Sequence, residues 1–147
     1  MPANPGGPEF PASHNAAVQF QGQAVRMPLR CLLVDDSDAF LETASLLLER
    51  EGLSVAGVAS SIAEALQQAR ALRPDLILVD IGLGDESGFD LARLLAEDGQ
   101  CEADVILISA GPEEDYIELI AESPAAGFLA KAELSVPRIG QILGRTS

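Results

Sequence analysis

Residues 32–38 read LLVDDSD, a short apolar run that ends in two adjacent acids. Three later apolar runs also end in a polar residue: LILV at 76–79 leads into Asp80, VILI at 105–108 into Ser109, and GFLA at 127–130 into Lys131. The runs are apolar without alternation, which is typical of strands buried on both faces of a parallel sheet. Because the carboxyl ends of parallel strands lie at one edge, we expect these polar residues to meet there.

Apolar runs alternate with segments of helical period along the rest of the chain. Ser61 and Glu64 form a capping box, Gly52 is placed to end a helix, and Pro74 to stop the next one. We therefore predict an α/β fold, a parallel sheet with helices on both faces. The expected strands are 29–34, 53–59, 76–79, 105–108 and 127–130, and the expected helices are 39–51, 62–72, 88–97, 113–122 and 134–143.

Residues 1–28 are rich in Pro and Gly and show no sustained period, so we interpret them as a disordered leader or a cloning remnant, followed by one domain at 29–147. The 147 residues include 9 Lys plus Arg and 23 Asp plus Glu, a net charge of −14. That charge argues against nucleic acid or an anionic membrane as the main partner. No run approaches the roughly 18 apolar residues of a membrane span, and no secretion signal opens the chain, so we expect a cytoplasmic protein.

The scarcity of some residue types limits the chemistry. The only histidine, His14, lies in the leader, which excludes Ser-His-Asp and Cys-His nucleophiles and a His-ligated zinc. The two cysteines, Cys31 and Cys101, have no metal-ligand spacing, and we interpret Cys31 as a core residue and Cys101 as a free thiol. Lys131 is the only lysine, so its place after the last strand favours a positioned charge.

The acids at the sheet edge indicate a phosphoryl-transfer site. Three carboxylates in a small space repel one another unless a cation joins them, and hard oxygen ligands suit Mg²⁺. A divalent ion, an ammonium and a hydroxyl around one carboxylate would form a receptor for a phosphoryl group. Asp80 would be the nucleophile, and Lys131 would neutralise phosphoryl oxygens.

These motifs resemble the receiver (CheY-like) domains of two-component response regulators over residues 29–143. The motifs are LLVDDSD, PDLILVDIGLGDESGFDL, VILISA and GFLAKAEL, in that order. The resemblance implies a flavodoxin-like, doubly wound sheet of strand order 2-1-3-4-5. The segments GLSVAGVASS and GFLAKAEL look more like those of receivers in LuxR-type helix-turn-helix regulators. Because the sequence ends at Ser147, without room for such an output domain, we expect either a stand-alone receiver or a chain cut before an output domain.

The resemblance also implies a role for each matching residue. Asp80 would be the phosphoacceptor in a phosphorelay, taking its phosphoryl group from a sensor histidine kinase or phosphotransfer protein. Magnesium would be bound by Asp36, by Asp35 mainly through water, by Asp80, and by the main-chain carbonyl of Gly82. Ser109 would move toward the phosphoryl group, Phe128 would rotate inward as the aromatic switch, and Lys131 would pair with the phosphoryl group.

The expected role is a signalling switch and not an enzyme, beyond Mg²⁺-dependent self-phosphorylation and self-dephosphorylation. Its partner, a downstream protein or a second copy, would bind the face of the fourth helix, fifth strand and fifth helix. Alternatives are a phosphorylation-independent interaction module and a Mg²⁺-dependent aspartyl phosphohydrolase, which usually has a second acid where Gly82 stands. A nucleotide-binding flavodoxin-like protein lacks support, because the loop after residue 34 is acidic and not glycine-rich. Gly82 and Gly111 stand where the family's side chains tune hydrolysis, and Ala132 stands where it often has Pro.

Overall fold

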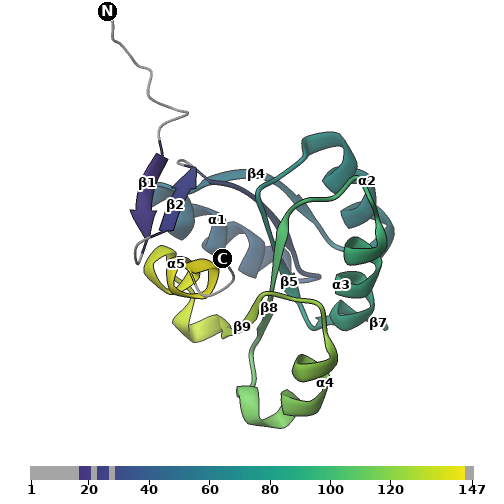
Figure 1. Ribbon diagram of the computed structural model, residues 1–147. Helices are drawn as coiled ribbons and strands as arrows, with labels where there is room; N and C mark the ends of the chain where they lie inside the picture. Colours follow the sequence, from purple (N-terminus) through teal and green to yellow (C-terminus); the bar gives the residue numbers. More distant parts are fainter. Residues whose placement is uncertain (1–16, 21–22, 27–28, 145–147) are drawn as a thin grey trace, which may run out of the picture.

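A parallel sheet of five strands forms the centre of the protein (Figure 1). The computed structural model describes residues 17–20, 23–26 and 29–144. The spatial order of the strands is β4-β3-β5-β8-β9, which is the predicted order 2-1-3-4-5 and confirms the predicted fold. The strands are β3 (Arg30–Val34), β4 (Ser54–Ala59), β5 (Leu76–Asp80), β8 (Asp104–Ser109) and β9 (Gly127–Ala130).

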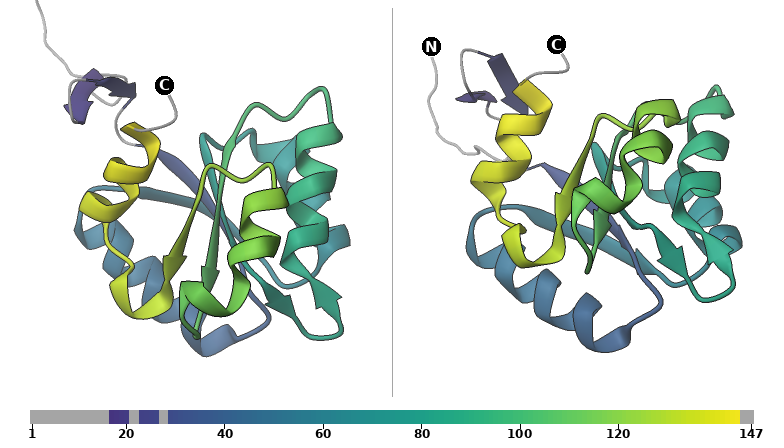
Figure 2. Two further views of the ribbon diagram at one scale, coloured as in Figure 1. Left: turned by 60° about the horizontal axis from the view of Figure 1, so that its bottom comes forward. Right: turned by 90° about the horizontal axis from the view of Figure 1, so that it is seen from below.

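Helices cover both faces of this sheet (Figure 2). The chain forms α1 (Asp38–Arg50), α2 (Ile62–Leu72), α3 (Gly88–Glu97), α4 (Ile117–Glu122) and α5 (Val136–Gly144). One core lies under α1 and α5 and receives Leu33, Leu78 and Ile106 from the sheet. The other lies under α2 and α3 and receives Ile77 and Leu107. Neighbouring strand residues thus point into different cores, which explains why each strand is apolar throughout.

Side-chain caps fix where the helices begin. The Ser37 hydroxyl accepts from the amide of Phe40 and starts α1, and the Ser61 hydroxyl accepts from the amide of Glu64 and starts α2. The Glu64 carboxylate accepts a hydrogen bond from the amide of Ser60, one residue earlier than in a standard capping box. Gly52 has a φ of +99°, a conformation that glycine adopts without a Cβ clash, so it ends α1 as predicted.

The fourth helical segment differs from its prediction. The sequence predicts one helix over 113–122, whereas the chain forms a 3-10 helix, η2 (Glu113–Tyr116), followed by the six-residue α4. Neither element contains a buried residue. A similar 3-10 turn, η3 (Lys131–Glu133), precedes α5, which begins at Val136 and not at the expected Leu134. Short helices depend on tertiary packing, so a weakly packed segment has little to keep it regular.

Four short strands were not predicted. β1 (Ala17–Phe20) and β2 (Gln23–Arg26) form an antiparallel pair beside α5, inside the range 1–28 for which we predicted a disordered leader. The rest of that range lies outside the described residues. β6 (Gly82–Leu83) and β7 (Glu86–Ser87) pair in the loop between β5 and α3. β6 and β7 have only two residues each, too few for a detectable period, and β1 (AVQF) and β2 (QAVR) lack the unbroken apolar run that predicted the central strands.

Gly88 allows α3 to pack directly behind Asp80. A Cβ placed on Gly88 would overlap the main-chain carbonyl of Asp80, which cannot move without displacing the strand end. We expect Gly88→Ala to lower the free energy of unfolding by about 1–3 kcal/mol, the usual cost of overpacking. The control is Gly99→Ala, because a Cβ at Gly99 meets nothing within 4 Å. Urea unfolding of both variants checks this, and equal effects would contradict the proposed close approach.

Candidate functional site

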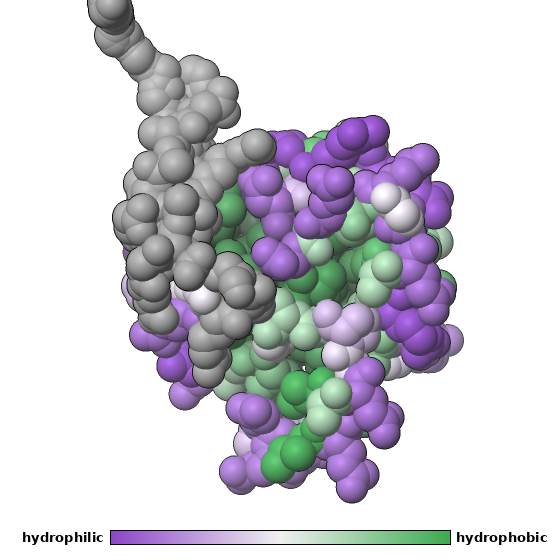
Figure 3. All heavy atoms as spheres, viewed as in Figure 1, coloured by the Kyte–Doolittle hydropathy of each residue, from purple (hydrophilic) through white to green (hydrophobic). Residues whose placement is uncertain are grey.

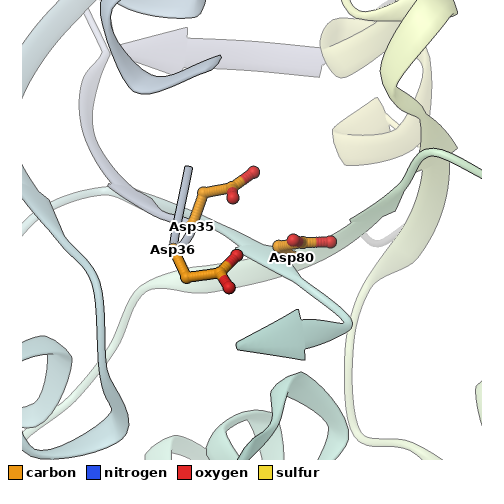
Figure 4. Close-up of side chains that lie close together, drawn as sticks. All are labelled: Asp35, Asp36 and Asp80. Carbon is orange, nitrogen blue, oxygen red and sulfur yellow. The ribbon is translucent and has the colours of Figure 1, made fainter. Parts of the chain in front are cut away.

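The carboxyl ends of β3 and β5 bring three acids together, as predicted. Asp35 and Asp36 follow β3, and Asp80 is the last residue of β5. One carboxylate oxygen from each lies within 4.8 Å of the others, and the close-up shows the three side chains gathered at the strand ends (Figure 4). Asp35 is 1% exposed and Asp80 8% exposed, whereas Asp36 is exposed to solvent.

Lys131 supplies positive charge to this cluster. Its Nζ lies 2.6 Å from Oδ2 of Asp35 and 3.4 Å from Oδ2 of Asp80. Lys131 is the first residue of η3, directly after β9, so the sheet edge delivers it to the acids as the sequence predicted. Its side chain is only 20% exposed, so the ion pairs are partly shielded from water and stronger than surface pairs.

The turn between β3 and α1 holds Asp35 in place. Oδ1 of Asp35 accepts from the amide of Ser37 at 2.9 Å, while Oδ2 pairs with Lys131. The Ser37 hydroxyl in turn caps α1 through the amide of Phe40. Lys131 Nζ lies 4.3 Å from the centre of the Phe40 ring, a contact that the sequence analysis missed. No local pattern signals it, because the two residues meet only through the fold.

Burial makes the ionised form of Asp80 costly. Desolvation and the nearby charge of Asp35 raise the pKa of Asp80 to about 6, although Lys131 and the amide of Gly82 lower it in part. Burial also lowers the pKa of Lys131, but its bond to Asp35 and the charges of Asp80 and Asp35 outweigh this, and its pKa is raised overall. The site therefore holds more negative charge than its one ammonium neutralises, and additional positive charge would favour ionised Asp80.

The donor set fits a hard divalent cation. The three carboxylates offer oxygen atoms on one side of the cluster, and Asp36 leaves the site open to water. Magnesium is bound in this way, by one or two carboxylates with several remaining waters. Gly82, expected to contribute its carbonyl, lies in β6 beside Asp80 and donates its amide to that carboxylate.

Ser109 and Phe128 lie on the two strands next to the site. Ser109 ends β8, is 3% exposed, and accepts a hydrogen bond from the amide of Gly111 at 3.0 Å. Phe128, in β9, is partly buried, and its ring centre lies 6.5 Å from that of Tyr116. The Tyr116 ring lies 6.4 Å from that of Phe89, so three rings form a row from β9 toward α3.

The raised pKa of Asp80 predicts a pH-dependent cost in the metal-free protein. The unfolded chain releases this proton near pH 3.8 and the folded chain near pH 6, so the cost is absent below pH 3.8 and complete above pH 6. In EDTA at pH 7.5, Asp80→Asn should therefore raise the free energy of unfolding by about 1–2 kcal/mol. The gain should vanish near pH 4.

Urea unfolding at both pH values provides the measurement. Asp85→Asn is the matched control, because it removes the same charge from an exposed position. A gain for Asp80→Asn that is equal at pH 4 and pH 7.5 would show that its origin is not the ionisation of Asp80.

No helix within the described ranges is long and apolar enough to cross a membrane.

Comparison with known proteins gives a match over residues 31–140 to the family model of the response regulator receiver domain. Response regulator GacA of Pseudomonas viridiflava is 30% identical over 104 residues, which cover 70% of this chain and 48% of GacA. A protein-glutamate methylesterase/protein-glutamine glutaminase of Anaeromyxobacter dehalogenans is 35% identical over 105 residues, 70% of this chain and 27% of that protein.

The solved structures agree with this result. The signal receiver domain of NarL from Mycobacterium tuberculosis superposes with a TM-score of 0.70 at 27% identity, covering 81% of this chain and 96% of that one. The chain spans half or less of the length of the curated relatives named above. Receiver domains are signalling modules that partner with histidine kinases. With the predicted sheet order and the acidic cluster at its edge, the family match shows that this chain belongs to the response regulator receiver domains.

Proposed function

We propose that Asp80 accepts a phosphoryl group from the phosphohistidine of a sensor histidine kinase or phosphotransfer protein. The observation that carries this proposal is the convergence of Asp35, Asp36 and Lys131 on the buried carboxylate of Asp80. An oxygen of Asp80 would attack phosphorus while the bond from phosphorus to the imidazole nitrogen breaks. The products are an aspartyl phosphate and the free histidine of the donor.

Each neighbour of Asp80 has a separate task in this reaction. Lys131, 3.4 Å away, is close enough to neutralise an incoming phosphoryl oxygen. Asp35 and Asp36, with Asp80 and the carbonyl of Gly82, would hold Mg²⁺, which supplies charge neutralisation for the phosphoryl oxygens when bound. Positioning and charge account for most of the catalysis, because phosphoryl transfer needs little other help from the protein.

Ser109 and Phe128 would carry the signal away from Asp80. The Ser109 hydroxyl would leave its local bond with Gly111 and bind a phosphoryl oxygen. Phe128, on the adjacent strand, would then rotate inward and leave Tyr116. Because β8 and β9 are paired at Ser109 and Ala130, a shift at the end of β8 would also move the end of β9.

The face formed by α4, β9 and α5 would bind the downstream protein, or a second copy of this chain. A hollow of about 510 Å³ lies there, lined in part by Ile120, Phe128 and Ile142. Ile117 and Leu119 of α4 are also exposed, and apolar surface is visible around β8, β9 and α4 (Figure 3). Exposed apolar side chains in a group mark interaction sites.

Charge favours a basic partner over a second copy. Five acids lie in η2 and α4, namely Glu113, Glu114, Asp115, Glu118 and Glu122. The net charge of −14 makes pairing of two copies unfavourable, whereas a segment with basic residues around an apolar stripe would gain from both features. The relatives include a glutamate methylesterase as well as DNA-binding regulators, so family membership leaves the output open.

Three further assignments complete the proposal. We assign the receiver domain to residues 29–147, place the protein in the cytoplasm, and expect its function to be most similar to that of receivers from LuxR-type regulators. A phosphohydrolase is less well supported, because Gly82 stands where such enzymes carry a second acid. A phosphorylation-independent module is also less well supported, because it would not require three mutually repelling carboxylates with a lysine ammonium beside them.

Phosphoryl acceptance is tested by intact mass after incubation with acetyl phosphate, with and without Mg²⁺. We expect a gain of one phosphoryl group that requires Mg²⁺ and is absent in Asp80→Asn, because the amide is a poor nucleophile. Asp85→Asn, which changes an exposed acid in the loop after β5, is the control and should be labelled normally. Labelling that persists in Asp80→Asn would assign the acceptor to another residue.

The switch is tested by amide hydrogen exchange with and without phosphorylation. We expect exchange in α4 to slow roughly three- to tenfold on phosphorylation, because rotation of Phe128 lets this weakly packed helix settle on β9. Ser109→Ala should remove the change in exchange without preventing labelling. The control is Ser45→Ala, at a half-buried position of α1, which should leave the change in exchange intact. A change of equal size in Ser109→Ala would exclude Ser109 from the switch.

A further inference from the structure

Lys131 has two different kinds of neighbour. Its ammonium pairs with the carboxylates of Asp35 and Asp80, and it also lies 4.3 Å from the centre of the Phe40 ring. A cation within about 6 Å of an aromatic ring face is attracted by the ring quadrupole, more strongly where water is partly excluded. With its side chain 20% exposed, Lys131 meets this condition.

Phe40 is held firmly in this position. Its amide donates to Ser37 Oγ in the first turn of α1, and its side chain packs against the core under α1 and α5. The amide of Ser37 also donates to Asp35. The ring and the carboxylate that contact Lys131 therefore belong to one short, hydrogen-bonded unit, while Lys131 reaches them from η3 at the other end of the domain sequence.

The two contacts respond differently to a divalent ion. A hard cation competes with the ammonium for the oxygens of Asp35 and Asp80, since it binds oxygen ligands. It does not compete for the ring, because a strongly hydrated ion gives up water for oxygen and not for an aromatic face. When the carboxylates bind the divalent ion, the cation–π contact with the Phe40 ring still holds the ammonium of Lys131 in place.

We propose that Phe40 is a positioning residue that holds the Lys131 ammonium beside Asp80 through its ring face. The contact itself does not depend on phosphorylation. Its consequence for phosphoryl transfer rests on the function proposed above: the ring keeps the ammonium where the incoming phosphoryl oxygens arrive.

A double-mutant cycle in urea unfolding, in EDTA, tests the contact itself. Phe40→Leu keeps an apolar side chain and removes the quadrupole, and Lys131→Met removes the charge. We expect Phe40→Leu to change the unfolding equilibrium constant about two- to tenfold more in the wild-type background than in the Lys131→Met background. Equal effects in both backgrounds would overturn the proposal, since they would assign Phe40 a packing role only.

Two further variants separate the ring from its packing. Phe40→Tyr keeps an aromatic face and should retain the coupling to Lys131. Phe89→Leu is the matched control, because Phe89 also lies in a capped first helical turn, where its amide donates to Ser87 Oγ, and its ring faces Tyr116. Its effect should be the same with and without Lys131→Met. Coupling of equal size for Phe89 would show that Lys131→Met perturbs the whole domain and would overturn the assignment to Phe40.

The functional consequence is measured with acetyl phosphate and saturating Mg²⁺. The acetyl phosphate concentration that gives half the maximal labelling rate should rise about two- to tenfold in Phe40→Leu, remain unchanged in Phe40→Tyr, and rise no further when Phe40→Leu is added to Lys131→Met. If wild type is labelled and Phe40→Leu leaves this concentration unchanged, the role in phosphoryl transfer is wrong. If wild type is never labelled, the proposed function fails, while the unfolding cycle still decides whether Phe40 holds Lys131.

Discussion

Repulsion between the buried carboxylates at the sheet edge is the constraint on which the site depends. Asp35 and Asp80 lose most of their hydration, yet lie close enough to share a cation with Asp36. Lys131 offsets part of this cost but leaves the pKa of Asp80 near 6. Because the site carries excess negative charge, a divalent ion bound there would relieve the repulsion, and a phosphoryl group on Asp80, as proposed above, would add to the charge that such an ion has to neutralise.

The surrounding fold restricts the movement of Asp35 and Asp80 and so keeps their negative charges close together. Ser37 fixes Asp35 and starts α1, while Gly88 lets α3 begin directly behind the carbonyl of Asp80. The β5 strand that carries Asp80 is buried along its whole length. Asp35 and Asp80 are therefore held close together, and their repulsion has to be offset by positive charge, of which Lys131 supplies a part.

The sequence was most informative where a single physical rule acts locally. Unbroken apolar runs predicted the parallel strands, and the polar residue after each run predicted which side chains would meet, including Asp35, Asp80 and Lys131. The contact between Phe40 and Lys131 was not predictable in this way, because no spacing connects two residues so far apart in the chain. The short η2 and α4 pair was also missed, since periodicity reports which face is apolar and not whether anything covers that face.

Rigidity at the site and weak packing at α4 are complementary properties. Asp80 lies on a strand that is buried along its whole length, whereas α4, which contributes Ile120 to the hollow beside β9, buries no residue. In the proposed switch, a change in charge at Asp80 would meet little freedom to move in the buried β5 and more in the weakly packed α4. Ser109 and Phe128 lie on the two strands between these regions, and Phe128 touches both the hollow and the Tyr116 ring. In the proposed switch, the charge would thus change at the rigid strand ends, and the resulting movement would occur at the loosely packed α4.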